Sequence, residues 1–328
     1  MTRIDFLVTG SSGFLGHAVT ERLTTSGYSF ATLGRAAPGP SSRHLRFDAG
    51  RSPLSDLPEM LAGIEPRWVL HLAGAPPASP PETAYRVNAG MLGQIIAALG
   101  GRVSRIVAIG TAAEYGETLM SNVPVAESAP CLPVGTYGLS KYAQTTVALA
   151  ARRRGVPVTI ARTFNLVGPG VPDHLSLGRF VQQLRGEAGR AGTLRVGALE
   201  KRRDFVEVGA AAHAIIGLAT SAAEMPAVVN VCSGVSTSLR DWLQGLIAAA
   251  GIEVTVETDS SLRRSFDPDD VVGCNALLRA CGFDIPAPAI DVVAQAIWRY
   301  RQDHAARTRT ADLGREKVTG LAKLASAE

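Results

Sequence analysis

Short apolar segments alternate with longer amphipathic segments along the first two thirds of this chain. The apolar segments have the length of buried strands, and the amphipathic segments repeat apolar residues at helical spacing. This alternation predicts a parallel sheet whose strands are joined by crossover helices. The expected strands are residues 4–9, 28–33, 68–72, 106–109, 156–161 and 228–231, and the expected helices are 17–26, 83–99 and 137–154. The pattern therefore predicts an α/β fold with a doubly wound parallel sheet.

The pattern changes after Gly168, where proline and glycine become frequent and arginines cluster between Arg179 and Arg203. Late helices are expected at 239–250 and 290–300, whereas the strand at 228–231 should return to the main sheet. We expect a first domain over residues 1–165 whose sheet is completed by about 206–235, and a smaller C-terminal substrate lobe from 166–205 and 236–302. Residues 303–328 are expected to form a polar tail.

Composition excludes several classes of partner. The chain has 328 residues, 46% of them hydrophobic, with 29 arginines, 4 lysines and a net charge of +4. No basic run interleaved with aromatic residues indicates nucleic-acid binding. The weakly polar stretch 210–232 contains charged residues and a proline, and the N-terminus lacks a signal-peptide pattern, so we expect a cytoplasmic protein without a membrane span. The four cysteines lack metal-ligand spacing, so we expect free thiols and no metal site.

A glycine-rich loop joins the first expected strand to the first expected helix, with the sequence Thr-Gly-Ser-Ser-Gly-Phe-Leu-Gly from residue 9. In this context the glycines allow a tight turn, the approach of a pyrophosphate to backbone N–H groups, and close packing of helix on strand. The pattern predicts a dinucleotide-binding Rossmann domain, although a plain turn is the alternative. The expected cofactor contacts in the loop are Gly10, Ser12, Gly13, Phe14, Leu15 and Gly16.

The second expected strand ends in Gly34-Arg35, where an NAD-selective site usually presents a carboxylate to the adenosine ribose. A cation there favours NADP(H), with NAD(H) possible, because arginine suits a 2′-phosphate. Arg35 as a surface residue, or stacked on adenine, is the alternative. Asp48 follows the expected third strand and is a candidate for the adenine amino group or for a turn.

Tyr137 and Lys141 are four residues apart on one expected helix, so they share a face. A nearby ammonium lowers the pKa of a phenol, which makes Tyr137 usable as a general acid or base in an alcohol–ketone interconversion. Lys141 is also a candidate for binding the nicotinamide ribose. Thr111 ends the expected strand 106–109 at the edge where ligands bind. Its hydroxyl is expected to hold the substrate oxygen, an ordinary strand-end hydroxyl being the alternative.

With these motifs in order, the chain resembles the extended short-chain dehydrogenase/reductases, which are the NAD-dependent epimerase/dehydratase family, as far as about Arg301. The shared landmarks are Gly10/Gly13/Gly16, His71-Leu72-Ala73, Asn88 with Gly93, Thr111 with Tyr115-Gly116, Tyr137/Lys141, Arg162-Thr163-Phe164-Asn165 with Gly168-Pro169, and Arg203-Asp204-Phe205. The resemblance implies that Leu72 and Ala73 contact the cofactor, and that Asn165, Arg203 and Arg264 bind the substrate diphosphate or ribose. It also implies a homodimer.

Within the family, residues 110–116 and 195–205 look most like the GDP-6-deoxy-4-keto-mannose reductases. Family dehydratases carry an acid after the catalytic threonine, whereas Ala112 and Ala113 stand here, so dehydration is disfavoured. Glu114 is either a substrate contact or a salt-bridge partner. The segment 208–210 lacks the usual aspartates and Arg264-Ser265 lacks the usual Arg-Pro, which leaves the nucleotide base open.

We expect the chain to reduce a 4-keto-(6-deoxy) nucleotide sugar, with NADPH as hydride donor and Tyr137 as proton donor. One alternative is a nucleotide-sugar 4-epimerase that retains NAD and uses the same three residues. A remote alternative from another class is a non-catalytic NAD(P)-binding protein, since a fold alone does not establish activity.

Overall fold

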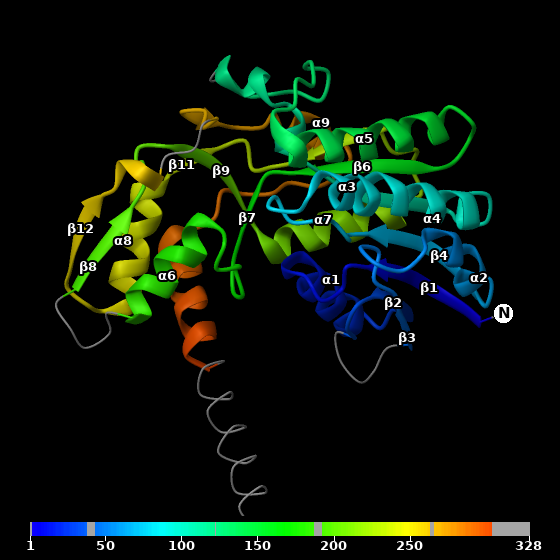
Figure 1. Ribbon diagram of the computed structural model, residues 1–328, viewed down its shortest axis with the longest axis horizontal. Coiled ribbons are helices and arrows are strands. Elements are labelled where there is room, and N and C mark those ends of the chain that lie inside the picture. The colour runs from blue at the N-terminus through cyan, green and yellow to red at the C-terminus, as the bar shows by residue number, and fades with distance from the viewer. Residues whose placement is uncertain (1, 38–42, 122, 187–191, 263–265, 304–328) are drawn as a thin grey trace, which may run out of the picture. The chain divides into compact units, whose positions relative to one another are not determined.

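Two compact units make up the chain, and each is described by itself (Figure 1). The computed structural model describes residues 2–37, 43–121, 123–186, 192–262 and 266–303. The larger unit comprises residues 1–167, 197–239 and 260–288, and the smaller unit comprises 168–196, 240–259 and 289–328. Residues 197–205 and 260–288, which the sequence placed in the substrate lobe, thus pack within the larger unit. The assignment of the smaller unit to substrate stays a prediction.

The larger unit is built on a seven-stranded, all-parallel sheet, which confirms the predicted doubly wound fold. Its strand order is β3-β2-β1-β4-β5-β6-β10, with β4 in the middle and β1 beside it. The strands are β1 (Thr2–Thr9), β2 (Phe30–Gly34), β3 (Arg43–Arg46), β4 (Ile64–His71), β5 (Arg105–Thr111), β6 (Val158–Thr163) and β10 (Val228–Val231). Because all strands run the same way, the loop after β1 and the ends of β4 and β5 meet at one carboxyl edge.

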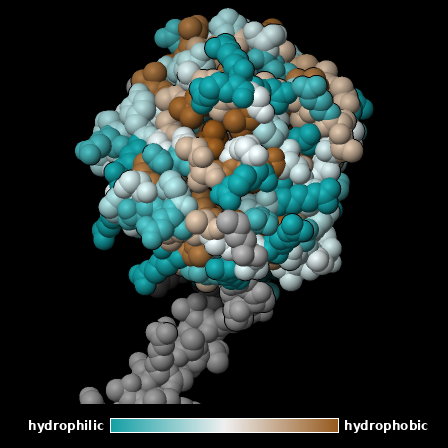
Figure 2. Space-filling model, turned by 90° about the vertical axis from the view of Figure 1, so that its right-hand side faces the viewer, coloured by the Kyte–Doolittle hydropathy of each residue, from teal (hydrophilic) through white to brown (hydrophobic). Residues whose placement is uncertain are grey.

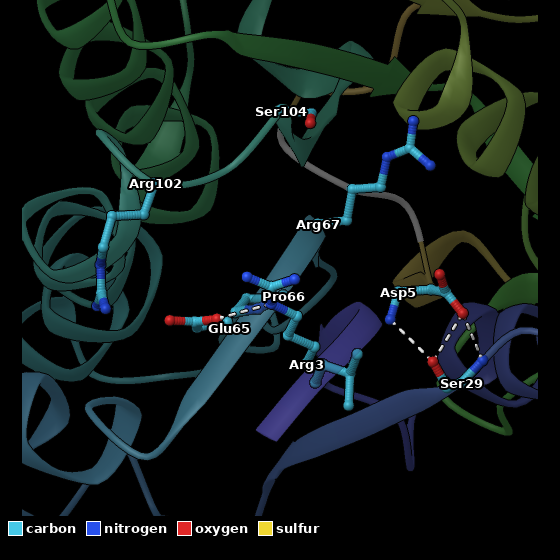
Figure 3. Close-up of a pocket in the computed structure, with 9 residues that line it drawn as sticks. Arg3, Asp5, Ser29, Glu65, Pro66, Arg67, Arg102 and Ser104 are labelled. Atoms are coloured by element: carbon cyan, nitrogen blue, oxygen red, sulfur yellow. Dashed lines mark hydrogen bonds and ion pairs between the residues drawn. The ribbon is translucent and has the colours of Figure 1, made fainter. Parts of the chain in front are cut away.

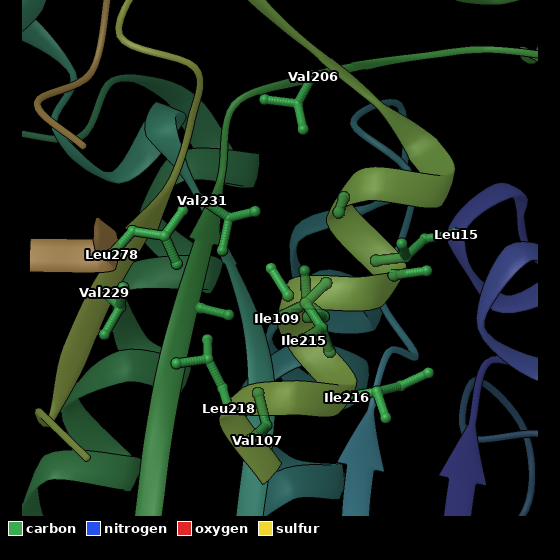
Figure 4. Close-up of a cluster of buried hydrophobic side chains, with 14 of the residues drawn as sticks. Leu15, Val107, Ile109, Val206, Ile215, Ile216, Leu218, Val229, Val231 and Leu278 are labelled. Carbon is green, nitrogen blue, oxygen red and sulfur yellow. The ribbon is translucent and has the colours of Figure 1, made fainter. Parts of the chain in front are cut away.

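Helices cover both faces of this sheet. The helices α1 (Phe14–Thr25) and α7 (Val208–Thr220) pack on one face, where Ile215 and Leu218 lie against Val107 and Ile109 of β5 (Figure 4). The other face is covered by α2 (Leu57–Leu61), α4 (Met91–Leu99) and α5 (Gly135–Arg152). Strand residues alternate between the two cores, as Leu7 does between Phe6 and Val8. The period of two that defines a strand thus fills two separate apolar layers.

Three features of this unit were not predicted. The helix expected at 83–99 is instead α3 (Pro81–Tyr85), a π-helical turn (Arg86–Gly90) and α4, and the turn carries the buried Asn88. Strand β4 begins at Ile64, earlier than expected. The sequence pattern missed this start because Glu65 and Arg67 interrupt the apolar run there. Helix α7 overlaps the weakly polar stretch 210–232, where no helix was predicted. Long-range packing, rather than local pattern, defines these elements.

A second sheet in the larger unit brings Asn165 and Arg203 onto neighbouring strands. It consists of β7 (Asn165–Val167), β9 (Arg202–Glu207), β11 (Ser236–Ser238) and β13 (Asp270–Val271), with β9 in the middle. Asp204 on β9 is buried and accepts hydrogen bonds from the amides of Ser233, Gly234 and Gly273 and from the Ser233 hydroxyl. The short helix α9 (Ala276–Ala280) follows. Asp204 therefore ties three segments together and is a structural residue.

The smaller unit contains a two-stranded parallel sheet and three helices among the described residues. These are β8 (Gly192–Val196) and β12 (Val254–Thr258), α6 (Ser176–Gly186), α8 (Leu239–Ala250) and a helix over 290–303. Its core contains the fully buried Trp242, and a Cβ at Gly245 would come within 2.7 Å of Ile290. Across both units, no helix in the described part of the chain is long and apolar enough to span a bilayer.

The amino ends of the main strands form a polar surface. Hydrophilic residues cover most of the face shown in Figure 2, around a broken strip of hydrophobic ones. Arg3, Asp5, Glu65 and Arg67 line an open hollow of about 530 Å³ there, in which Arg3 pairs with Glu65 at 3.3 Å (Figure 3). This hollow lies at the edge opposite the glycine-rich loop, so it is not the candidate site.

Candidate functional site

The glycine-rich loop has the close backbone approach that the sequence predicted. Gly10 has φ +70°, and a Cβ built on it would lie 2.6 Å from the Ala73 nitrogen. A Cβ at Gly16 would lie 2.2 Å from the Gly10 carbonyl oxygen, whereas Gly13 faces solvent at the N-cap of α1. Only glycine at positions 10 and 16 allows the loop to fold this tightly. The loop thus turns directly under the segment that follows β4.

The start of α1 is suited to an anion. No side chain caps it, and its first turn contains no acidic residue. The first amide N–H groups of a helix have no intrahelical acceptor, and they carry the positive end of the helix dipole. The Ser11 hydroxyl is buried in the same loop without a hydrogen-bond partner, and Ser12 beside it is exposed. Both features fit a dinucleotide whose pyrophosphate lies against the predicted contacts from Ser12 to Gly16.

The end of β4 is fastened to this loop. The Thr9 hydroxyl accepts a hydrogen bond from the Ala73 amide at 3.1 Å and lies 3.0 Å from Nδ1 of His71. The Leu72 amide donates to the Thr9 carbonyl at 3.2 Å. Burial, and then the charge of Lys141, lower the pKa of His71 to about 3, so the ring is neutral. Leu72 and Ala73 therefore lie next to the cofactor loop, and their contact with the cofactor stays a prediction.

Arg35 and Asp48 lie near the ends of β2 and β3. Arg35 is exposed just after β2, and it forms no ion pair with any residue in the described ranges. Asp48 accepts a hydrogen bond from the Gly50 amide at 3.0 Å, which is the turn role left open by the sequence. Neither placement tests the cofactor contacts expected of these residues.

Tyr137 and Lys141 lie one turn apart on α5, which approaches the end of β5 closely. A Cβ at Gly138, between them, would come within 2.9 Å of the Ala113 carbonyl oxygen. The glycine therefore lets this turn of the helix lie against the segment that follows Thr111. Ser140 donates to the Tyr137 carbonyl at 2.9 Å and accepts from the buried Asn88 amide at 2.8 Å. These contacts fix the turn that carries the phenol.

The phenol of Tyr137 lies close enough to the Thr111 side chain for the two hydroxyl groups to interact. Burial raises the pKa of Tyr137 above its ordinary value, the interaction with Thr111 opposes that shift, and the Glu114 carboxylate adds to it. The lowered pKa that the sequence predicted from the neighbouring ammonium is therefore wrong for the protein without cofactor or substrate, because burial outweighs the other effects. Thr111 also caps the following turn, because its Oγ1 accepts from the Ala113 amide at 3.3 Å. The structure thus joins the two hydroxyl groups that the sequence selected, and Thr111 serves the local turn as well.

The Lys141 ammonium is held inside the protein, next to Tyr137. Its Nζ donates to the Ile109 carbonyl at 2.5 Å and to Oε1 of Gln144 at 2.8 Å. Burial lowers the pKa of Lys141 to about 8, and the Glu114 carboxylate opposes this shift. The side chain is therefore mostly charged at neutral pH and becomes neutral under mildly alkaline conditions.

Glu114 forms a fully buried ion pair with Arg162. Its Oε2 accepts from Arg162 Nε at 3.0 Å and from the Thr145 hydroxyl at 2.7 Å, and its Oε1 accepts from the Thr111 amide at 2.9 Å. A Cβ at Gly110 would come within 2.5 Å of Oε1, so this glycine makes room for the carboxylate. The geometry favours the salt-bridge role left open for Glu114 over a substrate contact.

Two of the predicted substrate residues, Asn165 and Arg203, form hydrogen bonds with other segments of the chain. Asn165 donates to the Asp204 carbonyl at 3.4 Å, and the Arg203 guanidinium binds the Pro268 carbonyl at 3.0 Å and the Asp267 carboxylate. Arg264 lies outside the described residues. Substrate binding by these three residues stays a prediction.

Sequence reasoning missed Gln144, Ser11 and the Arg162–Tyr115 contact. The Arg162 guanidinium lies 4.7 Å from the Tyr115 ring centre, and the Tyr115 hydroxyl donates to Asn230 at 2.7 Å. Burial raises the pKa of Tyr115 to about 12, although Arg162 opposes the shift. The spacing of three residues between Lys141 and Gln144 was a local signal for that contact. Partners distant in sequence left no such signal.

Comparison with known proteins identifies the family of this chain. The profile of the NAD dependent epimerase/dehydratase family matches residues 6–232. The chain belongs to that family. Similar curated proteins include dTDP-6-deoxy-L-talose 4-dehydrogenase (NAD(P)(+)) of Kitasatospora kifunensis, 30% identical over 76% of this chain and 80% of that protein. GDP-6-deoxy-D-mannose reductase of Pseudomonas aeruginosa is 30% identical over 83% of this chain and 88% of that protein.

A solved structure agrees with this family assignment. The structure of RMD from Pseudomonas aeruginosa, complexed with NADPH, has a TM-score of 0.78 and 28% identity, covering 93% of this chain and 100% of that one. Family membership confirms the predicted resemblance to extended short-chain dehydrogenase/reductases and the Rossmann fold. The chain is accordingly an NAD(P)-dependent enzyme of the epimerase/dehydratase family.

Proposed function

We propose that this enzyme reduces the C4 ketone of a 4-keto-6-deoxy nucleotide sugar to the alcohol, with NADPH as the reductant. The observation that carries the proposal is that the Thr111 and Tyr137 hydroxyl groups lie close enough to interact at the carboxyl edge of the sheet, with the Lys141 ammonium one turn along the same helix. Two relatives that match most of the chain carry names for reactions at 6-deoxy nucleotide sugars. The family resemblance implies that Asn165, Arg203 and Arg264 bind the nucleotide sugar. It also implies that the active enzyme is a homodimer.

Tyr137 is the proton donor in this proposal. Because its pKa is raised, the phenol carries its proton at neutral pH, as reduction of a ketone requires. Thr111 lies beside the same hydroxyl and helps to hold a substrate oxygen there. Bound NADPH would supply the hydride. The buried Lys141 ammonium stabilises the negative charge that develops on the phenol when its proton leaves.

Elimination of water is disfavoured by the residues after Thr111. Ala112 and Ala113 carry no acid or base, and Ala112 is buried. Glu114 is the one carboxylate of this turn, and its two oxygens are bound to Arg162, Thr145 and the Thr111 amide. A carboxylate held in this way does not exchange protons with a substrate. The turn therefore supports reduction or epimerisation better than dehydration.

NADPH is proposed over NADH because Arg35 stands at the end of β2, where an NAD-selective site presents an acid. The exposed guanidinium, which forms no ion pair among the described residues, can make a bidentate contact with a 2′-phosphate. Among family relatives both cofactor types occur, since one relative is named for NAD(P)(+) and one structure contains NADPH.

An epimerase with retained NAD is the second candidate, because the same three residues serve both reactions. UDP-glucose 4-epimerase of Azospirillum brasilense is 32% identical, although the match covers 49% of this chain. The two candidates differ in cofactor use. A reductase consumes one cofactor per product and must release it, whereas an epimerase regenerates its cofactor within each cycle.

The deciding experiment uses two incubations of the full chain. In the first, the enzyme receives a panel of nucleotide-linked 4-keto-6-deoxy sugars with NADPH or NADH, and nicotinamide absorbance is followed. In the second, it receives UDP-glucose or GDP-mannose without added reductant, and C4 epimers are separated by chromatography. Loss of absorbance in step with product formation supports the reductase. Epimers in the second tube, with constant absorbance in the first, would replace it with the epimerase.

A further inference from the structure

Gln144 forms a closed set of hydrogen bonds with Lys141 and the backbone of β5. Lys141 Nζ donates to Gln144 Oε1 at 2.8 Å and to the Ile109 carbonyl at 2.5 Å, and Gln144 Nε2 donates to the same carbonyl at 2.9 Å. Gln144 is fully buried, and Lys141 is 4% exposed. Each of the three groups therefore contacts the other two, away from water.

The contacts determine how the Gln144 amide is oriented. Its oxygen must face the ammonium, which only donates, and its NH₂ must face the carbonyl, which only accepts. The reversed amide would place two donors together and two acceptors together inside the protein, where unsatisfied polar groups are costly. Gln144 is therefore matched to an ammonium at position 141, and a leucine of similar size would not provide either contact.

A neutral acceptor beside Lys141 has a chemical consequence. A buried ammonium needs polar partners, and a carboxylate would neutralise it. Here the nearby carboxylate, Glu114, is already paired with Arg162, so an amide and a carbonyl stabilise the lysine charge instead. These acceptors use two of the three ammonium hydrogens and leave one for another ligand. The lysine thus stays charged, fixed in place and available.

Other titratable groups face Lys141 from the elements packed around it. Glu114 on the turn after β5 and His71 at the end of β4 interact electrostatically with Lys141, and Tyr137 lies one helical turn before it on α5. His71 is neutral at pH 7 because its pKa is lowered to about 3, and the Tyr137 phenol is protonated. Of these three groups only Glu114 therefore carries charge at neutral pH, and it favours the ammonium.

We propose that Gln144 is a positioning residue for the catalytic lysine: it holds the Lys141 ammonium, together with the Ile109 carbonyl, in place for the nicotinamide ribose and the Tyr137 phenol. The inference rests on the proposed function for the role of Lys141. Gln144 itself contacts neither cofactor nor substrate in this proposal. Its effect is exerted through the position and the charge of the lysine.

Two substitutions separate this role from simple packing. Gln144→Met removes the acceptor, so the ammonium loses one partner and its pKa should fall below about 8. Cofactor affinity should then fall by up to about tenfold, less than the full loss of a charged hydrogen bond to the ribose, because the ammonium is less firmly held and less fully charged. Gln144→Glu keeps an acceptor for Lys141 and adds a negative charge, although it loses the donor to the Ile109 carbonyl. The lysine pKa should therefore rise, while cofactor affinity is largely retained because the ammonium stays charged. Thr146→Ala, which removes an exposed hydroxyl bonded within the same helix, is the matched control.

The experiment measures three quantities on the full chain after circular dichroism has shown which variants are folded. The first is the pKa of Lys141, from NMR of lysine labelled with ¹³C at Cε, assigned by comparison with Lys141→Met. The second is the dissociation constant of NADPH and NADH, from nicotinamide fluorescence. The third is the pH at which turnover falls on the alkaline side. We expect opposite shifts of the lysine pKa in Gln144→Met and Gln144→Glu, and none in Thr146→Ala.

The proposal is overturned if folded Gln144→Met has the wild-type lysine pKa and cofactor affinity. If Gln144→Met does not fold, Gln144→Glu decides, because an unchanged lysine pKa in that variant has the same meaning. The two proposals fail separately. An enzyme that binds cofactor but reduces no 4-keto sugar loses the proposed function, while the lysine pKa and the cofactor affinity still test Gln144.

Discussion

The carboxylate of Glu114 and the guanidinium of Arg162 meet at 3.0 Å, with side-chain exposures of 0% and 3%. Glu114 also binds the Thr111 amide, so the pair lies directly behind the residue that holds the Tyr137 phenol. Burial lowers the pKa of Arg162, but Glu114 and Tyr115 raise it overall above its ordinary value. The ion pair thus supports the end of β5 from inside the protein.

Removing one partner should therefore be strongly destabilising. Glu114→Gln leaves the buried Arg162 without its counter-charge, for which a loss of about 3 to 5 kcal/mol in the free energy of unfolding is expected. Urea unfolding followed by circular dichroism measures it. The control is Glu65→Gln, whose partner Arg3 is 91% exposed, and which should change stability by less than about 1 kcal/mol. Similar losses in both variants would contradict the structural role assigned to the pair.

Gly10 and Gly27 offer a matched test of the cofactor loop. Both have positive φ, +70° and +73°, but a Cβ at Gly10 meets Ala73 whereas one at Gly27 meets nothing within 4 Å. Gly27→Ala should cost about 1 to 2 kcal/mol from backbone strain alone and leave cofactor binding unchanged. Gly10→Ala should cost more and weaken NADPH binding, because the loop must move away from the segment after β4. Equal cofactor affinities in the two variants would argue against a cofactor site at this loop.

The local sequence pattern predicted those strands and helices whose apolar residues follow a regular pattern within the segment itself. The strand at 228–231 and the helix at 239–250 have the predicted bounds, because the first is a short, mostly buried run with three valines and the second repeats apolar residues at helical spacing. The helix at 83–99 was predicted as one element, but Arg86–Gly90 forms a π-helical turn. A Cβ at Gly90 would come within 2.9 Å of Leu54, which is distant in sequence. Such a close approach leaves no mark in the local pattern.

The same distinction explains what was found of the candidate site. Tyr137 and Lys141 are neighbours on a helix, and Thr111 ends a strand, so spacing and topology selected them. The contact of Gly138 with Ala113 and the pair of Glu114 with Arg162 join segments that are distant in sequence. Such contacts depend on the register of packed elements, which no single segment encodes.

Turnover should decline as the pH rises through about 8. Lys141 has a folded-state pKa of about 8, against 10.5 ordinarily, so its charge is lost as the pH rises past 8. The same pKa shift affects the free energy of unfolding. Burying the ammonium destabilises the fold below about pH 8, and this penalty disappears between pH 8 and 10.5. Lys141→Met should therefore gain stability relative to wild type at pH 7 and lose that gain by pH 10.5, as urea titrations at several pH values would show. A constant difference across that range would contradict the assignment.

Arg35 is expected to set the choice of cofactor. Wild type should bind NADPH more tightly than NADH, and Arg35→Asp should reverse the order, because a carboxylate repels the 2′-phosphate and accepts from a ribose hydroxyl. Fluorescence titration with both cofactors measures the preference. Arg67→Asp makes the same charge change at the opposite, amino edge of the sheet and should leave the preference intact. If wild type prefers NADH, Arg35 has no part in selectivity.

Tyr137→Phe tests the proton donor with the smallest possible change. The substitution removes one hydroxyl and keeps the ring, so the fold and the NADPH affinity should stay close to wild type. Turnover should fall about 10² to 10⁴-fold, the usual contribution of a positioned acid or base. Tyr142→Phe is the matched control, since Tyr142 lies on the same helix with 37% of its surface exposed. The loss should appear in kcat more than in KM, because the proton moves in the transition state rather than in the bound ground state. Full activity in folded Tyr137→Phe would remove the phenol from the mechanism, and equal losses in both variants would point to disruption of α5 instead.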